Sequence, residues 1–150
     1  MRKSRPKHLS YAKFLAIMLY SEKLGDEGET MVFLHGIAGS TRYWKSRVKP
    51  LAHHHQLLLV DLLGYGQSPK PWTKYTVDRH VDELYQVLRD EKAMTIVGHS
   101  FGAIVAIAFC ARFPHLVKRL ILISLPYFGD KQGAIKYFGE SHLAERYVTT

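Results

Sequence analysis

The residues best suited to carry out chemistry form one short pattern, Gly98-His99-Ser100-Phe101-Gly102, which has the form G-x-S-x-G. A β-branched apolar run precedes it and an alanine-rich stretch follows it, so it falls between an expected strand and an expected helix. A serine at such a sharp turn exposes its hydroxyl, and the flanking glycines let strand and helix approach closely. The N-terminal end of the helix would stabilise an oxyanion beside the serine. The pattern predicts a nucleophilic serine, in preference to a glycine-rich turn with an incidental serine.

Buried strands and helices that alternate along the chain must position this serine. Strands are predicted from solid apolar runs at 31–35, 57–60, 94–97 and 120–123, and a further short strand is expected within 14–20. Helices are predicted at 40–51, 77–88 and 101–112. This alternation predicts an α/β fold, with a mostly parallel sheet covered by helices on both faces. In such a sheet the ligand site lies beyond the carboxyl ends of the strands, where His35, Asp61 and Ser100 fall.

Four segments together resemble the N-terminal part of the α/β-hydrolase-fold serine hydrolases, over roughly residues 15–128: 35–40, 61–68, 98–102 and 112–122. The resemblance implies an incomplete α/β-hydrolase fold with Ser100 as the nucleophile. It also implies an oxyanion hole formed by the backbone N–H groups of Ile37 and Phe101. Serine at position 100 argues against the related epoxide hydrolases and haloalkane dehalogenases, whose pattern requires aspartate there.

The residues around the implied nucleophile receive supporting roles. Those expected to build its turn and the loop beside it are His35, Gly36, Gly98, His99 and Gly102. The two histidines of this set are interpreted as structural rather than as general bases. Asp61, which ends a strand and begins a turn, is expected to stabilise its loop rather than to catalyse.

The chain departs from the family's pattern in its remaining catalytic residues. A serine nucleophile needs a base and an orienting acid, and in this fold the acid follows the serine and the histidine follows the acid. Only 50 residues follow Ser100. Among them Asp130 and His142 have the formal order, but no predicted strand precedes His142 to hold it over the serine. Residues 129–150 are interpreted instead as the start of a helical cap.

We therefore expect the chain to be a fragment, an interrupted reading frame or one half of an assembly. Without later strands, residues 120–123 would form an exposed apolar sheet edge. A partner, or a missing C-terminal half, would cover that edge. The 150-residue chain by itself is expected to be inactive or weak.

Composition and charge exclude several other classes. The chain has 150 residues, 47% hydrophobic and 23% charged, which predicts one ordered domain. Its net charge of +8 includes five cations and no acid within residues 1–13, so we expect a basic tail at 1–13 before a nearly balanced domain at 14–128. No nucleic-acid partner is expected, because binding would need a basic face on the domain. Cys110, the single cysteine, excludes an internal disulfide, and consecutive histidines at 53–55 cannot all face one metal ion.

Two apolar segments imitate membrane elements. Residues 93–111 carry no charge if His99 is neutral, but Gly98-His99-Ser100 interrupts them. Residues 14–20 are short for a signal peptide, and no small-residue cleavage site follows them. No transmembrane segment is predicted, and a cytoplasmic location is expected.

The favoured function is a serine hydrolase that cleaves a small-molecule carboxylic ester or a similar carbonyl substrate, without a metal or organic cofactor. Hydrolysis of a carbon–carbon bond in a diketone-like substrate is a related reaction. One alternative is a non-catalytic interaction module that retains the hydrolase scaffold. A second is a membrane-surface protein that uses its basic tail and an exposed apolar face.

Overall fold

The structure is a computed structural model that describes residues 17–127, 129 and 132. The basic tail at 1–13 lies outside these residues, as do Asp130, His142 and all but two residues of the expected cap segment at 129–150. In the described part of the chain, no helix is long and apolar enough to cross a membrane.

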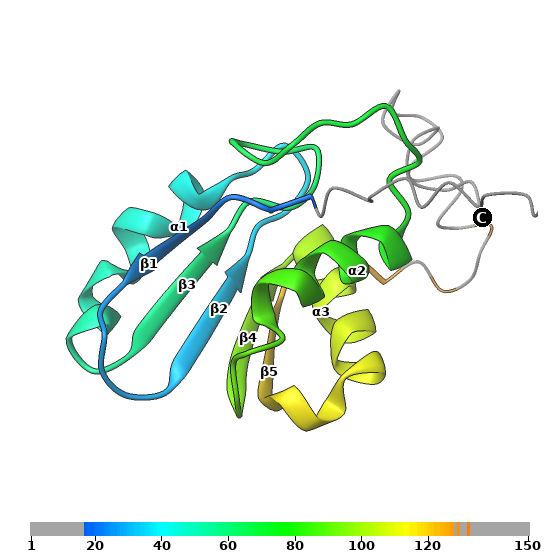
Figure 1. Ribbon diagram of the computed structural model, residues 1–150. Coiled ribbons are helices and arrows are strands. Elements are labelled where there is room, and N and C mark those ends of the chain that lie inside the picture. The colour runs from blue at the N-terminus through cyan, green and yellow to red at the C-terminus, as the bar shows by residue number, and fades with distance from the viewer. Residues whose placement is uncertain (1–16, 128, 130–131, 133–150) are drawn as a thin grey trace, which may run out of the picture.

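A five-stranded sheet forms the centre of the fold, in the spatial order β1-β3-β2-β4-β5 (Figure 1). The strands are β1 (Ser21–Leu24), β2 (Thr30–Leu34), β3 (Gln56–Val60), β4 (Met94–His99) and β5 (Val117–Ile123). β1 pairs antiparallel with β3, and the other three pairs are parallel. This confirms the predicted mostly parallel sheet. It also brings the carboxyl ends of β2 to β5 to one edge, which lies at the top in Figure 1.

Helices cover both faces of the sheet, as the sequence predicts. They are α1 (Thr41–Val48), α2 (Val77–Leu88) and α3 (Phe101–Arg112), with the short 3-10 helices η1 (Lys49–His53) and η2 (Pro114–Leu116). α2 and α3 lie on one face and α1 lies on the other (Figure 1). α2 begins where Thr76 Oγ1 accepts a hydrogen bond from the Arg79 N–H (3.1 Å), a typical N-cap.

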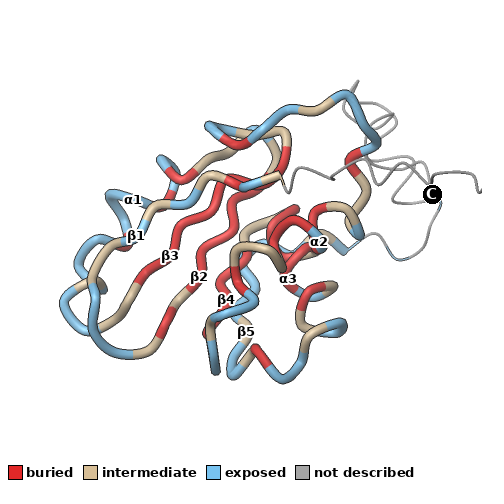
Figure 2. The backbone as a smooth tube through the Cα atoms, viewed as in Figure 1, coloured by how far each residue is buried: buried red, intermediate tan, exposed pale blue. Residues whose placement is uncertain are grey.

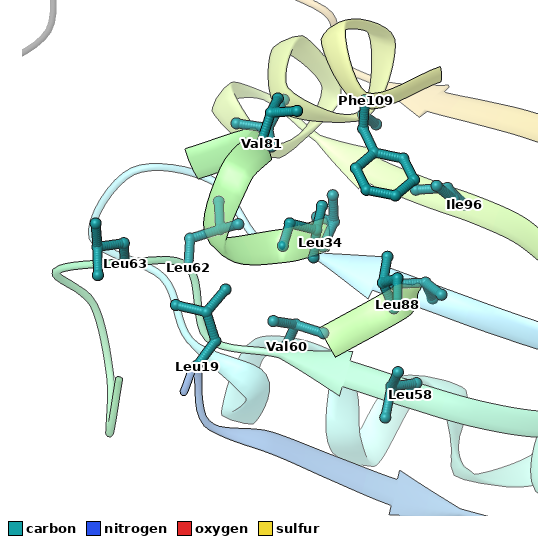
Figure 3. Close-up of a cluster of buried hydrophobic side chains, with 14 of the residues drawn as sticks. Leu19, Leu34, Leu58, Val60, Leu62, Leu63, Val81, Leu88, Ile96 and Phe109 are labelled. Carbon is teal, nitrogen blue, oxygen red and sulfur yellow. The ribbon is translucent and has the colours of Figure 1, made fainter. Parts of the chain in front are cut away.

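Alternating strand residues divide the core between the two faces. Leu34, Val60 and Ile96 face α2 and α3 and belong to the larger cluster, part of which Figure 3 shows. Phe33 faces α1, where its ring lies 5.2 Å from the ring of Trp44. The central strands are thus buried on both faces, as the red segments of Figure 2 show. This double burial explains why their sequences are solid apolar runs.

The first strand differs from the sequence expectation. The structure places β1 at Ser21–Leu24, and residues 17–20 are not strand, so the strand expected within 14–20 is wrong over its described part. β1 is an edge strand whose residues are alternately exposed and half-buried, so it has no solid apolar run. Leu19, from the expected run, is instead buried in the larger core cluster.

β5 forms the opposite edge of the described sheet and is largely exposed (Figure 2). Its register places Ile121 beside Val97 and Ile123 beside His99. Ile121 and Ile123 are nevertheless 42% and 40% exposed, because α1 packs on β2 and β3 and no described helix covers this face of β5. The exposed apolar edge expected at 120–123 is therefore present in the described part of the chain.

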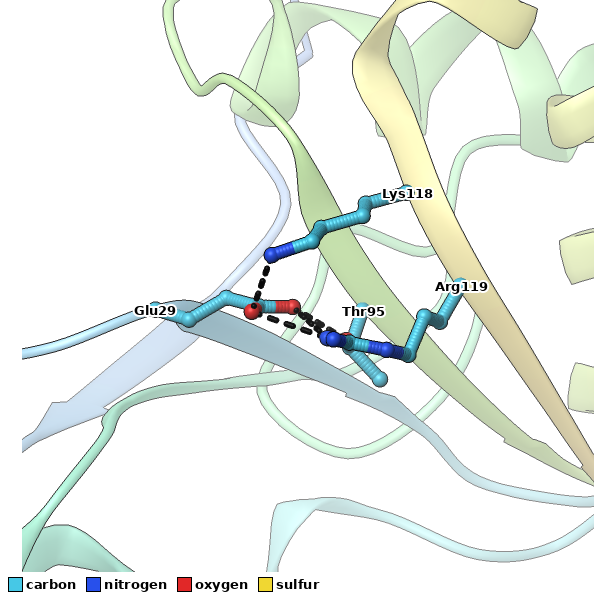
Figure 4. Close-up of polar contacts among 4 residues, drawn as sticks. All are labelled: Glu29, Thr95, Lys118 and Arg119. Carbon is cyan, nitrogen blue, oxygen red and sulfur yellow. Dashed lines mark hydrogen bonds and ion pairs between the residues drawn. The ribbon is translucent and has the colours of Figure 1, made fainter.

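An ionic cluster ties β5 to the start of β2 at the amino edge of the sheet (Figure 4). The Glu29 carboxylate accepts hydrogen bonds from three side chains: Thr95 Oγ1 (2.6 Å), Lys118 Nζ (2.9 Å) and Arg119 Nη1 (2.6 Å). Neighbouring strand residues normally point to opposite faces, but a register shift between β4 and β5 at this point lets Lys118 and Arg119 reach one carboxylate. The hydrogen bonds from Thr95 and the two cations lower the pKa of Glu29 to about 2.

Glu29→Gln should lower stability at neutral pH but not in strong acid. Because the pKa of Glu29 falls from 4.5 to about 2 in the folded protein, its charge stabilises the fold above pH 4.5, and this contribution disappears as the pH falls toward 2. The Tm difference between wild type and Glu29→Gln should be largest at neutral pH. It should shrink toward zero as the pH falls from 4.5 to about 2. Glu27→Gln, at an exposed glutamate of the same turn, is the control. A Tm difference that does not change with pH would contradict the ionic role.

Candidate active site

Ser100 occupies a sharp turn between the end of β4 and the start of α3. Its backbone has φ 53° and ψ −116°, a conformation that residues with a side chain rarely adopt. Two hydrogen bonds hold this backbone: the Ser100 N–H donates to the Ile123 carbonyl (2.9 Å), and the Ala103 N–H donates to the Ser100 carbonyl (2.9 Å). The turn therefore fixes a half-buried serine at the carboxyl edge of the sheet.

Close backbone contacts require both glycines of this turn. A Cβ atom on Gly98 would lie 2.5 Å from the Gly102 carbonyl oxygen. One on Gly102 would lie 2.5 Å from the Leu34 carbonyl oxygen. Because real Cβ atoms do not approach backbone oxygens so closely, α3 can pack against β2 and β4 only with glycine at both positions. The glycine spacing that predicts the turn thus has a direct steric cause.

The loop after β2 lies against this turn. The Gly39 N–H donates to the Gly36 carbonyl (3.0 Å), which closes a four-residue turn. Ala38, in the third position, has a φ of 58°, which is typical of a type II turn. Ile37 occupies the second position and lines the same pocket as Ser100. The structure therefore brings together two residues that the sequence assigned to one site from distant segments.

The pocket between this loop and the serine has a volume of about 300 Å³. Its lining residues are Gly36, Ile37, Ala38, Gly39, Tyr43, His99 and Ser100. The His99 ring stacks on Tyr43 with the ring centroids 5.1 Å apart, and the Arg47 guanidinium lies 4.9 Å from the Tyr43 centroid. α1 therefore supplies one wall of the pocket. The sequence did not single out Tyr43, because only the packing of α1 on the sheet brings it to the serine.

His35 lies buried behind the loop and connects it to the segment after β3. Its Nε2 accepts a hydrogen bond from the Leu62 N–H (3.0 Å), and its Nδ1 donates to the Gly36 carbonyl (2.7 Å). Burial lowers the pKa of His35, and the Gly36 carbonyl and the Asp61 carboxylate oppose that shift. Because backbone groups engage both ring nitrogens, His35 has no nitrogen available for a proton from Ser100.

Asp61 is buried at the end of β3, where it holds two neighbouring segments. Its carboxylate accepts hydrogen bonds from the backbone N–H groups of Thr41 (2.5 Å) and Gln67 (2.8 Å). Its carbonyl accepts a hydrogen bond from the Ser68 hydroxyl (2.5 Å). These contacts fix the first turn of α1 against the loop after β3, which is a structural use of the residue.

His80 is a second buried histidine near the turn, and the sequence did not single it out. Its ring, on α2, meets the buried ring of Phe101 edge-on with the centroids 5.1 Å apart. Neither ring nitrogen has a hydrogen-bond partner among the described residues. Burial, and to a lesser extent the nearby His35, lowers the pKa of His80 to about 4. The sequence does contain a signal for its burial. His80 lies three residues after Val77 and four before Leu84, on the apolar face of the predicted helix.

His80→Phe should reduce the acid sensitivity of the fold. The unfolded chain takes up a proton on this histidine near its ordinary pKa of 6.5, whereas the folded protein resists protonation down to about 4. His80 should therefore contribute a loss of up to about 3 kcal/mol as the pH falls through this interval, and His80→Phe should lack that contribution while keeping the one from His35. Urea unfolding from pH 7 to 4 measures this slope. His115→Phe, at an exposed histidine, should leave it unchanged, and an equal slope in His80→Phe would contradict the assignment.

The described residues supply a serine without the partners that would activate it. In this part of the chain no hydrogen bond joins the Ser100 hydroxyl to a histidine or a carboxylate. The acid and base considered from the sequence, Asp130 and His142, lie outside the described residues. Within the described ranges, no three His, Cys, Asp or Glu residues are grouped so that they could hold a metal ion.

Comparison with known proteins agrees with this fold. Residues 29–139 match the family described as the alpha/beta hydrolase fold, and the chain belongs to that family. An uncharacterized protein of Mycobacterium tuberculosis is 38% identical over 104 residues, covering 68% of this chain and 30% of that protein. The probable lysophospholipase BODYGUARD 3 of Arabidopsis thaliana is 36% identical over 116 residues, covering 72% of this chain and 23% of that protein.

Solved structures show the same relationship. A marine microorganism esterase superposes with a TM-score of 0.67 at 30% identity, over 71% of this chain and 41% of its own. An epoxide hydrolase of Bacillus megaterium superposes with a TM-score of 0.70 at 27% identity, over 81% of this chain and 48% of its own. The chain spans less than a third of these curated relatives and less than half of these solved structures. The resemblance and the α/β fold inferred from the sequence are confirmed.

Proposed function

We propose that Ser100 is the nucleophile of a serine hydrolase that acts on a carboxylic ester or a similar carbonyl substrate. The observation that carries this proposal is the strained Ser100 backbone between β4 and α3, at a pocket that Ile37 also lines. Strain of this kind, held by surrounding contacts, is typical of functional sites. Esterase and probable lysophospholipase relatives support ester chemistry.

The proposed reaction is acyl transfer in two steps. A general base removes the Ser100 proton, and Oγ attacks the substrate carbonyl carbon. The backbone N–H groups of Ile37 and Phe101 donate hydrogen bonds to the oxyanion of the tetrahedral intermediate, and the N-terminal end of α3 adds a favourable dipole. The intermediate expels the alcohol and leaves an acyl-serine. Water then attacks the acyl carbon, and the second intermediate releases the acid and regenerates the serine.

Serine at position 100 also favours carbonyl substrates over epoxides within the family. If a serine hydroxyl opened an epoxide, the product would be an ether, which water does not readily cleave. An acyl-serine is an ester, and a base-activated water can hydrolyse it. Similarity to an epoxide hydrolase therefore supports the shared scaffold of the two proteins rather than a shared reaction.

The base and its orienting acid are proposed to come from outside the described residues. His35 is engaged at both nitrogens, and His99 forms a wall of the pocket. A serine hydroxyl without a base is a weak nucleophile. Turnover therefore depends on a base supplied from beyond the described ranges.

The test is covalent labelling with a fluorophosphonate, which reacts with base-activated serines. After labelling, mass spectrometry of the digest should find the label on Ser100. The exposed β5 edge favours a second candidate, a non-catalytic module that pairs through this strand. A folded protein that neither takes up label nor hydrolyses esters would support the module and overturn the hydrolase.

A further inference from the structure

The loop between β3 and α2 presents one tryptophan entirely to solvent. Trp72 is 101% exposed, whereas large aromatic side chains are usually at least partly covered. Lys70 and Lys74 lie two residues to either side of it, and the segment 69–77 contains no acid. The loop lines a hollow of about 610 Å³ together with Gly64. The loop therefore combines a solvent-exposed aromatic ring with two flanking cations.

Hydrogen bonds anchor the loop that exposes Trp72. Tyr75 is buried, and its hydroxyl donates a hydrogen bond to the Pro71 carbonyl (2.7 Å). Lys70 Nζ donates to the Gly66 carbonyl (2.6 Å) and, at 3.2 Å, to the Ser68 carbonyl. These contacts anchor the segment on both sides of the tryptophan. The Trp72 indole therefore projects into solvent from an anchored loop.

Other exposed apolar side chains lie on the same edge of the molecule. The loop follows β3, so it lies at the carboxyl edge of the sheet with Ser100, along the top of Figure 1. Tyr127 follows β5 at this edge and is 89% exposed. Met18 precedes the antiparallel β1, and its segment reaches the same edge because the Asp61 N–H donates to the Tyr20 carbonyl (2.9 Å). Met18 is 69% exposed.

We propose that this carboxyl edge docks on an anionic lipid surface through the Trp72 loop. Tryptophan settles at the depth of lipid headgroups, and flanking lysines attract anionic phosphates while their stems cover apolar surface. The two lysines beside Trp72 supply the charge complementarity to an anionic surface. The docked orientation turns the Ser100 edge toward the lipid. Docking itself requires no catalysis and stands apart from the proposed reaction.

Vesicle binding by the full 150-residue chain tests this inference. The probes are vesicles of phosphatidylcholine alone and vesicles with about one third phosphatidylglycerol. Trp44 is 6% exposed, so a shift of tryptophan emission to the blue on binding should come from Trp72. The Trp44→Phe variant, with Trp72 as its only tryptophan, should show the full shift on anionic vesicles. Binding should weaken as salt is raised.

Variants distinguish the loop from other contacts. Trp72→Ala should weaken binding about tenfold, and Lys74→Gln should weaken it about fivefold at low salt. Lys92→Gln, at an exposed lysine just before β4 at the opposite edge, is the matched control and should not change binding. Circular dichroism should show that each variant is folded. The inference is overturned if anionic vesicles do not bind, or if Trp72→Ala binds as tightly as wild type, whether through β5 or through residues 1–13.

Discussion

Ser100→Ala should abolish ester hydrolysis by the protein, with a fall in kcat of at least about 10³-fold. The variant keeps the turn and the pocket but has no oxygen to attack the substrate carbonyl. The N–H groups proposed for the oxyanion hole should still stabilise an oxyanion formed by water, which would leave a small residual rate. Hydrolysis of p-nitrophenyl acyl esters measures this loss. KM should change much less than kcat, because the pocket walls are unaltered.

Ser124→Ala is the matched control for this prediction. Ser124 also has a positive φ, 51°, and also follows the carboxyl end of a strand, β5. It lies outside the residues that line the Ser100 pocket, so its hydroxyl should be dispensable. The fluorophosphonate label should disappear in Ser100→Ala and persist in Ser124→Ala. Retained hydrolysis in a folded Ser100→Ala would remove Ser100 from its proposed role.

Most of the architecture could be predicted because the central strands are buried on both faces. β3 and β4 consist almost entirely of buried residues, so their positions are visible as short apolar runs between polar segments. α2 was visible for a different reason, since its apolar residues repeat at helical spacing on one face. β1 lacks both signals because it is a short edge strand, and the expectation placed it too early in the chain.

The turn at Ser100 could also be predicted, because the close approach of strand and helix requires glycine at two fixed positions around the serine. The contacts that position its surroundings could not be predicted, because they join segments distant in sequence. Glu29 meets Lys118 and Arg119 only through the register of β5. The sequence contains the three charges but not the strand pairing that brings them together. Trp72 is a similar case, since its full exposure depends on how Tyr75 anchors the loop.

The second large effect is expected at Gly102, where any side chain should force α3 away from β2. A Cβ atom there would lie 2.5 Å from the Leu34 carbonyl oxygen and 2.6 Å from the His35 carbonyl oxygen. Both are backbone atoms of the end of β2 and its loop, so neither can rotate away as a side-chain tip would. Gly102→Val should lower the free energy of unfolding by about 3 kcal/mol or more, as severe overpacking does. Urea unfolding followed by circular dichroism measures it.

Ala111→Val separates this clash from the helix propensity of valine. Ala111 is exposed on the same helix, so this control should lose less than about 1 kcal/mol. Gly102→Ala should already be damaging, because the clash involves the Cβ atom itself rather than the outer part of the valine. The Ser100 turn and the Ile37 loop both adjoin this contact, so labelling of Ser100 should fall together with stability in both Gly102 variants. If Gly102→Val unfolds at the same urea concentration as wild type and labels normally, the close approach of α3 to β2 is not what shapes the turn.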